Sequence, residues 1–325
     1  MIKVVVIDHS KGEPELTHVA TTPVLADAIV EGEVMDPAVL SEAIKGLFTG
    51  LKHKRVAIAV GGRDVIIKRI QVDRMKESDA AEVVRWEAQQ HVPFDVEGVE
   101  LDFQVLDPEG DGLQMDVLLV AAKRELVETK ITLLADAGLQ AKTVDVDAFA
   151  LHNAFELNYP EAMDGVVAVA NVGHEVTNVG IVEDGIPLLT RDLTVGTRKF
   201  REDLQRDLGM SAEDADGILV AGVPRSELQP YVDARGEEIA VGVERAAAFL
   251  QAASRDAPGI QQLFLSGGGA RIYGLKEALG NRLGLPVEIA NPIQRLQVAE
   301  GVFDMMDVDE ISPLLMLGVG LGLRA

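Results

Sequence analysis

The sequence predicts an α/β protein of two lobes, with a small α+β subdomain inserted into the first lobe. The chain has 325 residues, of which 47% are hydrophobic, and near this length a single core commonly divides in two. Strand patterns and helix patterns alternate along the chain. Two strands followed by a helix open the first half, and three strands followed by helices open the second, which indicates a duplicated lobe.

The first lobe is predicted at residues 1–61 and 144–164. Its strands are expected at residues 1–6, 15–23 and 55–60. Asp36 and Pro37 predict the start of a helix, because aspartate accepts a hydrogen bond at the N-cap and proline fits the first turn.

The inserted subdomain is predicted at residues 62–143. Its strands are expected at 64–72, 99–106 and 115–122, and its helices at 78–91 and 123–137. Gly138 follows the second helix, at a position where glycine commonly ends helices.

The second lobe is predicted at residues 165–325. Its strands are expected at 166–171, 176–183, 186–192, 263–266 and 287–290. Its helices are expected at 197–209, 211–221, 236–255 and 272–283, and in a last segment that reaches residue 325. Gly318, Gly320 and Gly322 lie in this last segment, where they predict close packing of a terminal helix and not a dinucleotide-binding fingerprint.

The composition argues against several classes of function. Lys and Arg total 30 against 53 Asp and Glu, and the net charge of −23 repels nucleic acids and anionic lipids. The acidity either keeps the chain dissolved or attracts a basic partner. Cysteine is absent, which removes disulfides and thiolate chemistry and fits a reducing compartment. No apolar run approaches the length of a membrane span, so we expect a soluble protein that could still lie beside a membrane.

Two glycine loops are candidates for binding a nucleotide. The strand that ends at Val172 runs through Gly173 into a return strand, and such a turn can aim backbone N–H groups and a threonine hydroxyl at a phosphate. The alternative is an ordinary hairpin. The strand that ends at Ser266 runs through Gly267-Gly268-Gly269 toward a helix predicted at Ile272, which allows close approach of an adenine ring or phosphate. The candidate nucleotide-binding residues are Asn171, Gly173, Thr177, Asn178, Gly267, Gly268, Gly269 and Arg271.

Motifs of metal and hydrolase chemistry are missing. His174-Glu175 lacks the second histidine of zinc peptidases, and Ser266 is not in a Gly-x-Ser-x-Gly elbow. Asp145 and Asp147 could share one face of a strand end as a metal site or an acid–base pair, but a solvated strand end that caps the helix from Ala148 is the commoner explanation of such a pair. We therefore assign no catalytic residue and no metal ligand.

Trp86, Pro93 and Phe94 are candidate partner-binding residues. Trp86 is the only tryptophan, and the helix that carries it ends at a proline followed by an aromatic residue. Such bulky residues can anchor a partner. The alternative is that Trp86 packs the helix onto the sheet of the inserted subdomain.

These features together resemble the actin-like (ribonuclease H-like) superfamily, and the inserted subdomain narrows the resemblance to FtsA-like and PilM-like proteins. Several segments resemble the PilM family in order and spacing, over a range that runs from Ile2 to the C-terminus. They are Val34-Met35-Asp36-Pro37, Arg85-Trp86-Glu87-Ala88-Gln89-Gln90, Pro93-Phe94, Leu101-Asp102-Phe103-Gln104-Val105-Leu106, Met115-Asp116-Val117-Leu118-Leu119-Val120-Ala121-Ala122 and Val144-Asp145-Val146-Asp147.

The resemblance implies a cytoplasmic adaptor of type IV pilus assembly. PilM proteins bind the short cytoplasmic N-terminal tail of PilN, an inner-membrane protein, and the first lobe with its inserted subdomain is expected to hold that tail. Contact with the pilus motor ATPases is expected as well, membrane contact only through the partner, and homo-oligomer formation is left open. The family also binds ATP, with Mg²⁺, between its lobes.

The sequence departs from the family at the nucleotide site. The family pattern begins with a strand and Gly-Leu-Asp-Ile-Gly-Ser, the first phosphate loop, before the Ile-Lys that matches Ile2-Lys3. His174 and Glu175 replace small residues that make room for phosphates, and Leu219 replaces a lysine that holds the ribose and base. Either a leading segment is missing or the site has decayed, so we expect weak or absent ATP binding.

Two other functions are weaker alternatives. An FtsA-like filament former or membrane tether needs a basic amphipathic C-terminal helix, which residues 314–325, with Arg324 as the one charged residue, do not supply. An active actin-like ATPase or sugar-kinase-like enzyme needs both phosphate loops and an activating carboxylate, so we expect at most a weak ATPase.

Overall fold

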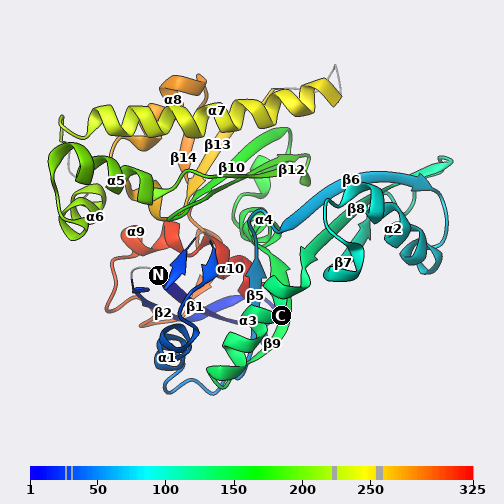
Figure 1. Ribbon diagram of the computed structural model, residues 1–325, viewed down its shortest axis with the longest axis horizontal. Coiled ribbons are helices and arrows are strands. Elements are labelled where there is room, and N and C mark those ends of the chain that lie inside the picture. The colour runs from blue at the N-terminus through cyan, green and yellow to red at the C-terminus, as the bar shows by residue number, and fades with distance from the viewer. Residues whose placement is uncertain (26–27, 31, 222–224, 254–258, 325) are drawn as a thin grey trace. The chain divides into compact units, whose positions relative to one another are not determined.

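The computed structural model describes residues 1–25, 28–30, 32–221, 225–253 and 259–324 (Figure 1). The chain divides into two compact units. The first unit comprises Met1–Leu25, Ile29–Glu33 and Asp147–Ala325, and the second is mainly Val34–Val146. Two-residue strands β3 (Ile29–Val30) and β4 (Glu33–Val34) pair with each other. The boundaries predicted for the lobes and the inserted subdomain stay a prediction.

The first unit is built around a five-stranded sheet of order β12-β11-β10-β13-β14. Its strands are β10 (Val166–Val172), β11 (Thr177–Glu183), β12 (Ile186–Leu193), β13 (Gln262–Ser266) and β14 (Val287–Ile289). The pairs β10–β11 and β11–β12 are antiparallel, and the pairs β10–β13 and β13–β14 are parallel. The three successive strands predicted to open this region are confirmed.

Helices cover both faces of this sheet. They are α4 (Asp147–Asn158), α5 (Thr197–Leu208), α6 (Ala212–Val220), α7 (Gln229–Ala253), α8 (Leu275–Leu283), α9 (Val308–Ile311) and α10 (Met316–Gly322). Figure 1 shows α7 running along the sheet. Strand β10 is apolar and buried at every position except Asn171, as expected for a central strand.

The side chains of β10 alternate between two hydrophobic cores. Ala168 and Ala170 join the core that contains Phe200 of α5 and Ile239 of α7. Val167 and Val169 join the core that contains residues of α4 and α10. In the latter core the rings of Phe155, Tyr159 and Phe264 pack together, with centroids 4.7 to 5.2 Å apart. The period-two pattern of one strand thus joins α5 and α7 on one face to α4 and α10 on the other.

A second sheet of the first unit has the order β1-β2-β15, with strands β1 (Ile2–Asp8), β2 (Glu15–Thr22) and β15 (Gln297–Val298). Strand β1 is antiparallel to β2, and β2 is parallel to β15. Among the described residues β1 has a ladder partner on one side only. The β1–β2 hairpin corresponds to β11–β12 of the larger sheet, and the counterpart of β10 is not found in the described part of the chain.

Helix α10 packs through its glycines. A Cβ atom at Gly318 would lie 2.7 Å from Cγ2 of Val5, and one at Gly322 would lie 2.8 Å from Cδ1 of Ile7. A Cβ atom at Gly320 would overlap the carbonyl oxygen of Ala150 on α4. The close packing predicted for these three glycines is confirmed.

The second unit holds two smaller sheets. Strands β5 (Arg55–Val60) and β9 (Gln140–Val146) are parallel, and β6 (Val65–Asp73), β8 (Gln114–Lys123) and β7 (Val99–Val105) form an antiparallel sheet in that order. Its helices are α1 (Pro37–Leu47), α2 (Glu77–His91) and α3 (Arg124–Asp136). The predicted N-cap is confirmed, because the Asp36 side chain accepts a hydrogen bond from the Val39 N–H at 3.0 Å.

Two predicted helix starts are wrong. Residues Gly268–Arg271 form a 3₁₀ turn, and α8 begins only at Leu275. The preceding Gly274 has φ +84°, a left-handed conformation that cannot be part of an α-helix. Helix α7 begins at Gln229 and not at residue 236, since Gly236 lies inside the helix and lets it approach Ala278 of α8. The predicted end of this helix, near residue 255, lies outside the described residues. Within the described ranges, none of the helices has the length and apolar character needed to cross a membrane.

We predict that Gly320→Ala lowers the free energy of unfolding by about 2 kcal/mol or more, because the new methyl group overlaps backbone and not a flexible side chain. Urea unfolding followed by circular dichroism measures the loss. The control is Gly217→Ala on α6, which meets nothing within 4 Å and should be neutral or stabilising by up to about 1 kcal/mol. Equal effects of the two changes would contradict the packing described for α10.

Candidate functional site

The two glycine loops lie at the same edge of the five-stranded sheet. Strands β10 and β13 are parallel neighbours, and Asn171 is in register with Ser266. The loop at Gly173 and the loop at Gly267 therefore leave the sheet side by side, at the carboxyl ends of adjacent strands. This is the edge at which open α/β sheets commonly bind ligands.

Asn171 connects the two loops. Its Nδ2 donates to Asn178 Oδ1 at 3.3 Å, and its Oδ1 accepts from Ser266 Oγ at 3.3 Å. Asn178 in turn donates through Nδ2 to Asp192 Oδ1 at 2.7 Å. The structure thus brings the predicted residues Asn171, Asn178 and Gly267 together.

The three glycines of the second loop have different reasons to be glycine. Gly267 has φ +83°, and a Cβ atom there would lie 2.5 Å from the carbonyl oxygen of Val172. A Cβ atom at Gly269 would overlap the Val172 side chain, whereas at Gly268 the nearest atoms are 3.8 Å away or more. Packing against β10 therefore explains Gly267 and Gly269, and Gly268 has room for a side chain.

Thr177 does not present its hydroxyl to a ligand. Its side chain is buried, and Oγ1 donates to the Val195 carbonyl oxygen at 2.7 Å. The expectation that this hydroxyl binds a phosphate is wrong in this conformation, because its proton is committed to the backbone that leads into α5. Gly173 has a similar structural role, since its N–H donates to Val176 O at 2.9 Å and its carbonyl oxygen accepts from Thr197 N at 3.0 Å.

His174 and Glu175 occupy the turn between β10 and β11. His174 Nδ1 lies 3.2 Å from Thr197 Oγ1, and Glu175 forms an ion pair of 2.7 Å with Arg198. Burial, and secondarily the charge of Arg201, lower the pKa of His174 below its ordinary value of 6.5. The ion pair with Arg198 holds Glu175 at the loop. Its carboxylate remains a hydrogen-bond acceptor at the place where an anionic phosphate would need donors.

Helices α5 and α6 contribute a second group of polar residues. Arg201 on α5 lies 3.3 Å from the Asp216 carboxylate on α6, and within the described residues its buried Nε has no hydrogen-bond partner. Leu219, at the position where the family has lysine, is buried in the core. Arg271 follows the second glycine loop and pairs with Glu310 at 2.9 Å.

Lys3 is a candidate that the sequence analysis did not identify. Its Nζ donates to Leu314 O at 2.9 Å, and the adjacent Pro313 carbonyl oxygen accepts from Gly267 N at 2.8 Å. Burial lowers the pKa of Lys3, and the charge of Asp147 opposes this shift. A single lysine within an apolar strand was the signal in the sequence.

The fit to a nucleotide is partial. Gly268 leaves open space in the second loop. Arg271 and Lys3 add positive charge close to it, and both features suit a phosphate. Three other residues do not suit a phosphate or nucleotide: Leu219 offers no donor, Glu175 is an acceptor, and the hydroxyl of Thr177 already donates to Val195 O. In the parts of the chain that the structure describes, no three His, Cys, Asp or Glu side chains gather as a metal site.

The interpretation of Asp145 as part of a solvated strand end is wrong. Asp145 is only 5% exposed, and its Oδ1 accepts a hydrogen bond from the Val146 N–H at 2.8 Å. Asp147 is the first residue of α4. One carboxylate oxygen of Asp145 is thus bound by the backbone at the end of β9.

The candidate partner residues of the second unit differ in exposure. Trp86 on α2 is 59% exposed, so the alternative that it packs the helix onto the sheet is wrong. Val84 and Ala88 on the same helix make that contact instead. Pro93 is exposed, whereas Phe94 packs partly against the core, with Lys123 Nζ 4.8 Å from its ring centroid. Trp86 and Pro93 are therefore exposed, whereas Phe94 is partly buried against the core.

Comparisons with known proteins agree with this architecture. The chain matches the family described as Type IV pilus assembly protein PilM over residues 1–325. A solved structure described as a PilM-PilN type IV pilus biogenesis complex matches with a TM-score of 0.87 and 29% identity, covering 99% of this chain and 94% of that one.

More distant matches concern the fold alone. The ethanolamine utilization protein EutJ from Carboxydothermus hydrogenoformans matches with a TM-score of 0.58 and 17% identity, over 100% of this chain and 90% of that one. MreB5 of Spiroplasma citri bound to ADP matches with a TM-score of 0.50 and 13% identity, over 94% of this chain and 78% of that one. The actin-like α/β fold predicted from the sequence is confirmed.

We predict that His174 titrates below its ordinary pKa of 6.5, because burial disfavours its charged form. Since the unfolded chain then binds the proton more tightly, the contribution of His174 to stability is complete above pH 6.5 and is lost as the pH falls. The ring signal in an NMR titration measures this, with His174→Gln to assign it and the urea-unfolded chain as reference. A midpoint at or above that of the unfolded chain would contradict the partial desolvation of this ring.

Proposed function

The chain belongs to the family of type IV pilus assembly protein PilM, and from this membership we propose that it is a cytoplasmic adaptor that binds the N-terminal tail of a PilN-like inner-membrane protein. The observation that carries the proposal is the match to the PilM-PilN complex, with a TM-score of 0.87 at 29% identity over nearly the whole of both chains. In this role the chain reaches the membrane through its partner and passes signals toward the pilus motor ATPases.

The exposed side of α2 is the proposed place of contact. Trp86 presents an aromatic surface that the protein's own core does not use, and exposed aromatic residues commonly anchor protein partners. Pro93 continues this surface beyond the end of the helix. Strands β6 and β7 are the two edges of the adjoining sheet, which suits an extended peptide.

We further propose that ATP with Mg²⁺ binds weakly or not at all. This rests on the partial fit of the glycine-loop site, where Glu175 adds an acceptor and Leu219 offers no donor. Bound nucleotide would supply phosphate charge to this edge of the sheet, and Gly268, Arg271 and Lys3 are the residues placed to hold it. With so few donors, we expect the adaptor to hold its partner without nucleotide control.

The membrane-tether alternative gains no support from α10. Met316, Val319 and Gly320 of this helix are buried within the first unit. A membrane-binding amphipathic helix needs an apolar face that is free to enter lipid.

The proposal predicts that Trp86→Ala weakens binding of a synthetic PilN-type tail peptide by about tenfold or more, the loss expected at a hot-spot aromatic residue. Isothermal calorimetry, with and without ATP and Mg²⁺, measures the affinity. The thermal midpoint should stay unchanged, because Trp86 is largely exposed.

The matched control is Phe249→Ala, another aromatic residue on an exposed helix surface, on α7, which is 63% exposed. It should leave peptide binding unaltered. An unmodified chain that does not bind the tail peptide would overturn the proposed function. Equal losses in the two variants would overturn the proposed place of contact.

A further inference from the structure

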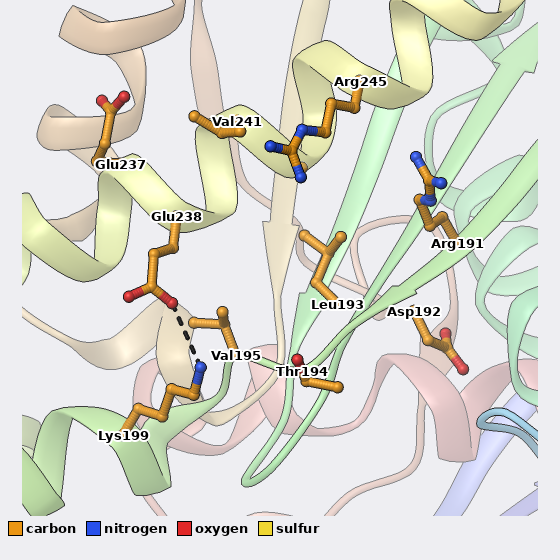
Figure 2. Close-up of a pocket in the computed structure, with 11 residues that line it drawn as sticks. Arg191, Asp192, Leu193, Thr194, Val195, Lys199, Glu237, Glu238, Val241 and Arg245 are labelled. Carbon is orange, nitrogen blue, oxygen red and sulfur yellow. Dashed lines mark hydrogen bonds and ion pairs between the residues drawn. The ribbon is translucent and has the colours of Figure 1, made fainter.

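A pocket of about 500 Å³ lies on the first unit, between the end of β12, the start of α5 and the middle of α7. Figure 2 shows Leu193 and Val241 at its apolar part, with Arg245 reaching from α7 and Arg191 rising from β12 beside them. Gly242 helps to form the hollow, because a Cβ atom there would overlap the Leu193 side chain.

The acidic residues of this pocket already have partners. Asp192 accepts from Asn178 Nδ2 at 2.7 Å, and Glu237 pairs with Arg282 of α8. Glu238 pairs with Arg235 and, at 3.4 Å, with Lys199 (Figure 2). The negative charges of the wall are thus bound to donors within the protein.

The two arginines are different. Arg191 and Arg245 are exposed, and neither makes an ion pair or side-chain hydrogen bond within the part of the chain that the structure describes. The lining has three basic and three acidic residues, and because the acidic ones are paired, Arg191 and Arg245 are the cations that remain for an occupant. Guanidinium groups bind carboxylates through paired hydrogen bonds, so the pocket suits an anionic occupant.

The backbone beside the pocket favours an extended occupant. Strand β12 is an edge of the five-stranded sheet, and among the described residues its outer side has no ladder partner. An edge strand presents unpaired N–H and C=O groups to which an extended peptide can add. Arg191 and Leu193 are two residues apart on β12 and therefore project to the same face of the sheet. An added peptide can place an apolar side chain beside Leu193, and acidic side chains at the alternate positions of that same face, toward the guanidinium groups.

We propose that this pocket is a second docking site, which takes an acidic, extended peptide segment of a protein partner. Its charge preference is set by Arg191 and Arg245 and its apolar contact by Leu193. The site lies on a different unit from Trp86.

The test is fluorescence anisotropy of the full chain with the labelled hexapeptide Thr-Val-Thr-Glu-Thr-Glu, which carries valine and glutamate on the same face when extended, and with the same peptide carrying glutamine for glutamate. Arg191→Glu and Arg245→Glu should each weaken binding of the glutamate peptide by about tenfold or more, and the glutamine peptide should bind as weakly as those variants do. Arg55→Glu is the matched control, since Arg55 is likewise exposed and unpaired within the described residues, and it should change the affinity by less than about twofold.

Several outcomes would overturn the proposal. Equal losses in the three variants would mean nonspecific attraction to charge. Equal binding of the two peptides would remove the role of the arginines. Competition by inorganic phosphate as strong as that by unlabelled peptide would make the pocket a small-anion site. Unchanged tail-peptide binding in Arg191→Glu and Arg245→Glu keeps this test separate from that of the proposed function.

Discussion

The parallel register of β10 and β13 is the constraint on which the rest of the candidate site depends. Because Asn171 lies opposite Ser266, both glycine loops leave the sheet at one edge, and one amide side chain can hydrogen-bond to residues of both strands. The same register brings Val172 against the second loop, which forces glycine at positions 267 and 269. These glycines would be needed even in a protein that binds no ligand, so a glycine-rich loop is weak evidence of nucleotide binding here.

A second constraint is the set of three glycines on α10. This helix approaches β1 and α4 so closely that Gly318, Gly320 and Gly322 leave no room for a methyl group. The contact joins the two sheets of the first unit and places the 3₁₀ turn at Ser312–Leu314, whose carbonyl oxygens accept from Gly267 N and Lys3 Nζ. Packing of α10 thereby positions the carbonyl oxygens of Pro313 and Leu314 beside the second glycine loop and Lys3.

Much of the fold could be predicted from the sequence, because long apolar periodic segments such as β10 and the sheet of the second unit have few alternatives. The helix starts at α7 and α8 could not, since they depend on Gly236 and Gly274, and whether a glycine continues or ends a helix is decided by tertiary packing. The glycine loops were found because glycine is a local signal. Three side-chain positions could not be predicted, because each depends on which side of an element the fold covers. They are the hydrogen bond from Thr177 to Val195 O, the burial of Asp145 and the exposure of Trp86. The unpaired state of Arg191 and Arg245 has no sequence signal at all.

The proposed partner surface lies on the second unit, and the glycine loops lie on the first. The central claim is that the chain binds its partner without a nucleotide. Hydrogen–deuterium exchange of the full chain, measured by mass spectrometry with a PilN-type tail peptide and separately with ATP and Mg²⁺, tests this claim most directly. The account predicts that the peptide slows exchange in the segments around α2 and the strands beside it, and that ATP with Mg²⁺ leaves the loops at Gly173 and Gly267 unchanged. Protection of both glycine loops by ATP, together with peptide protection that appears only when ATP is present, would contradict it.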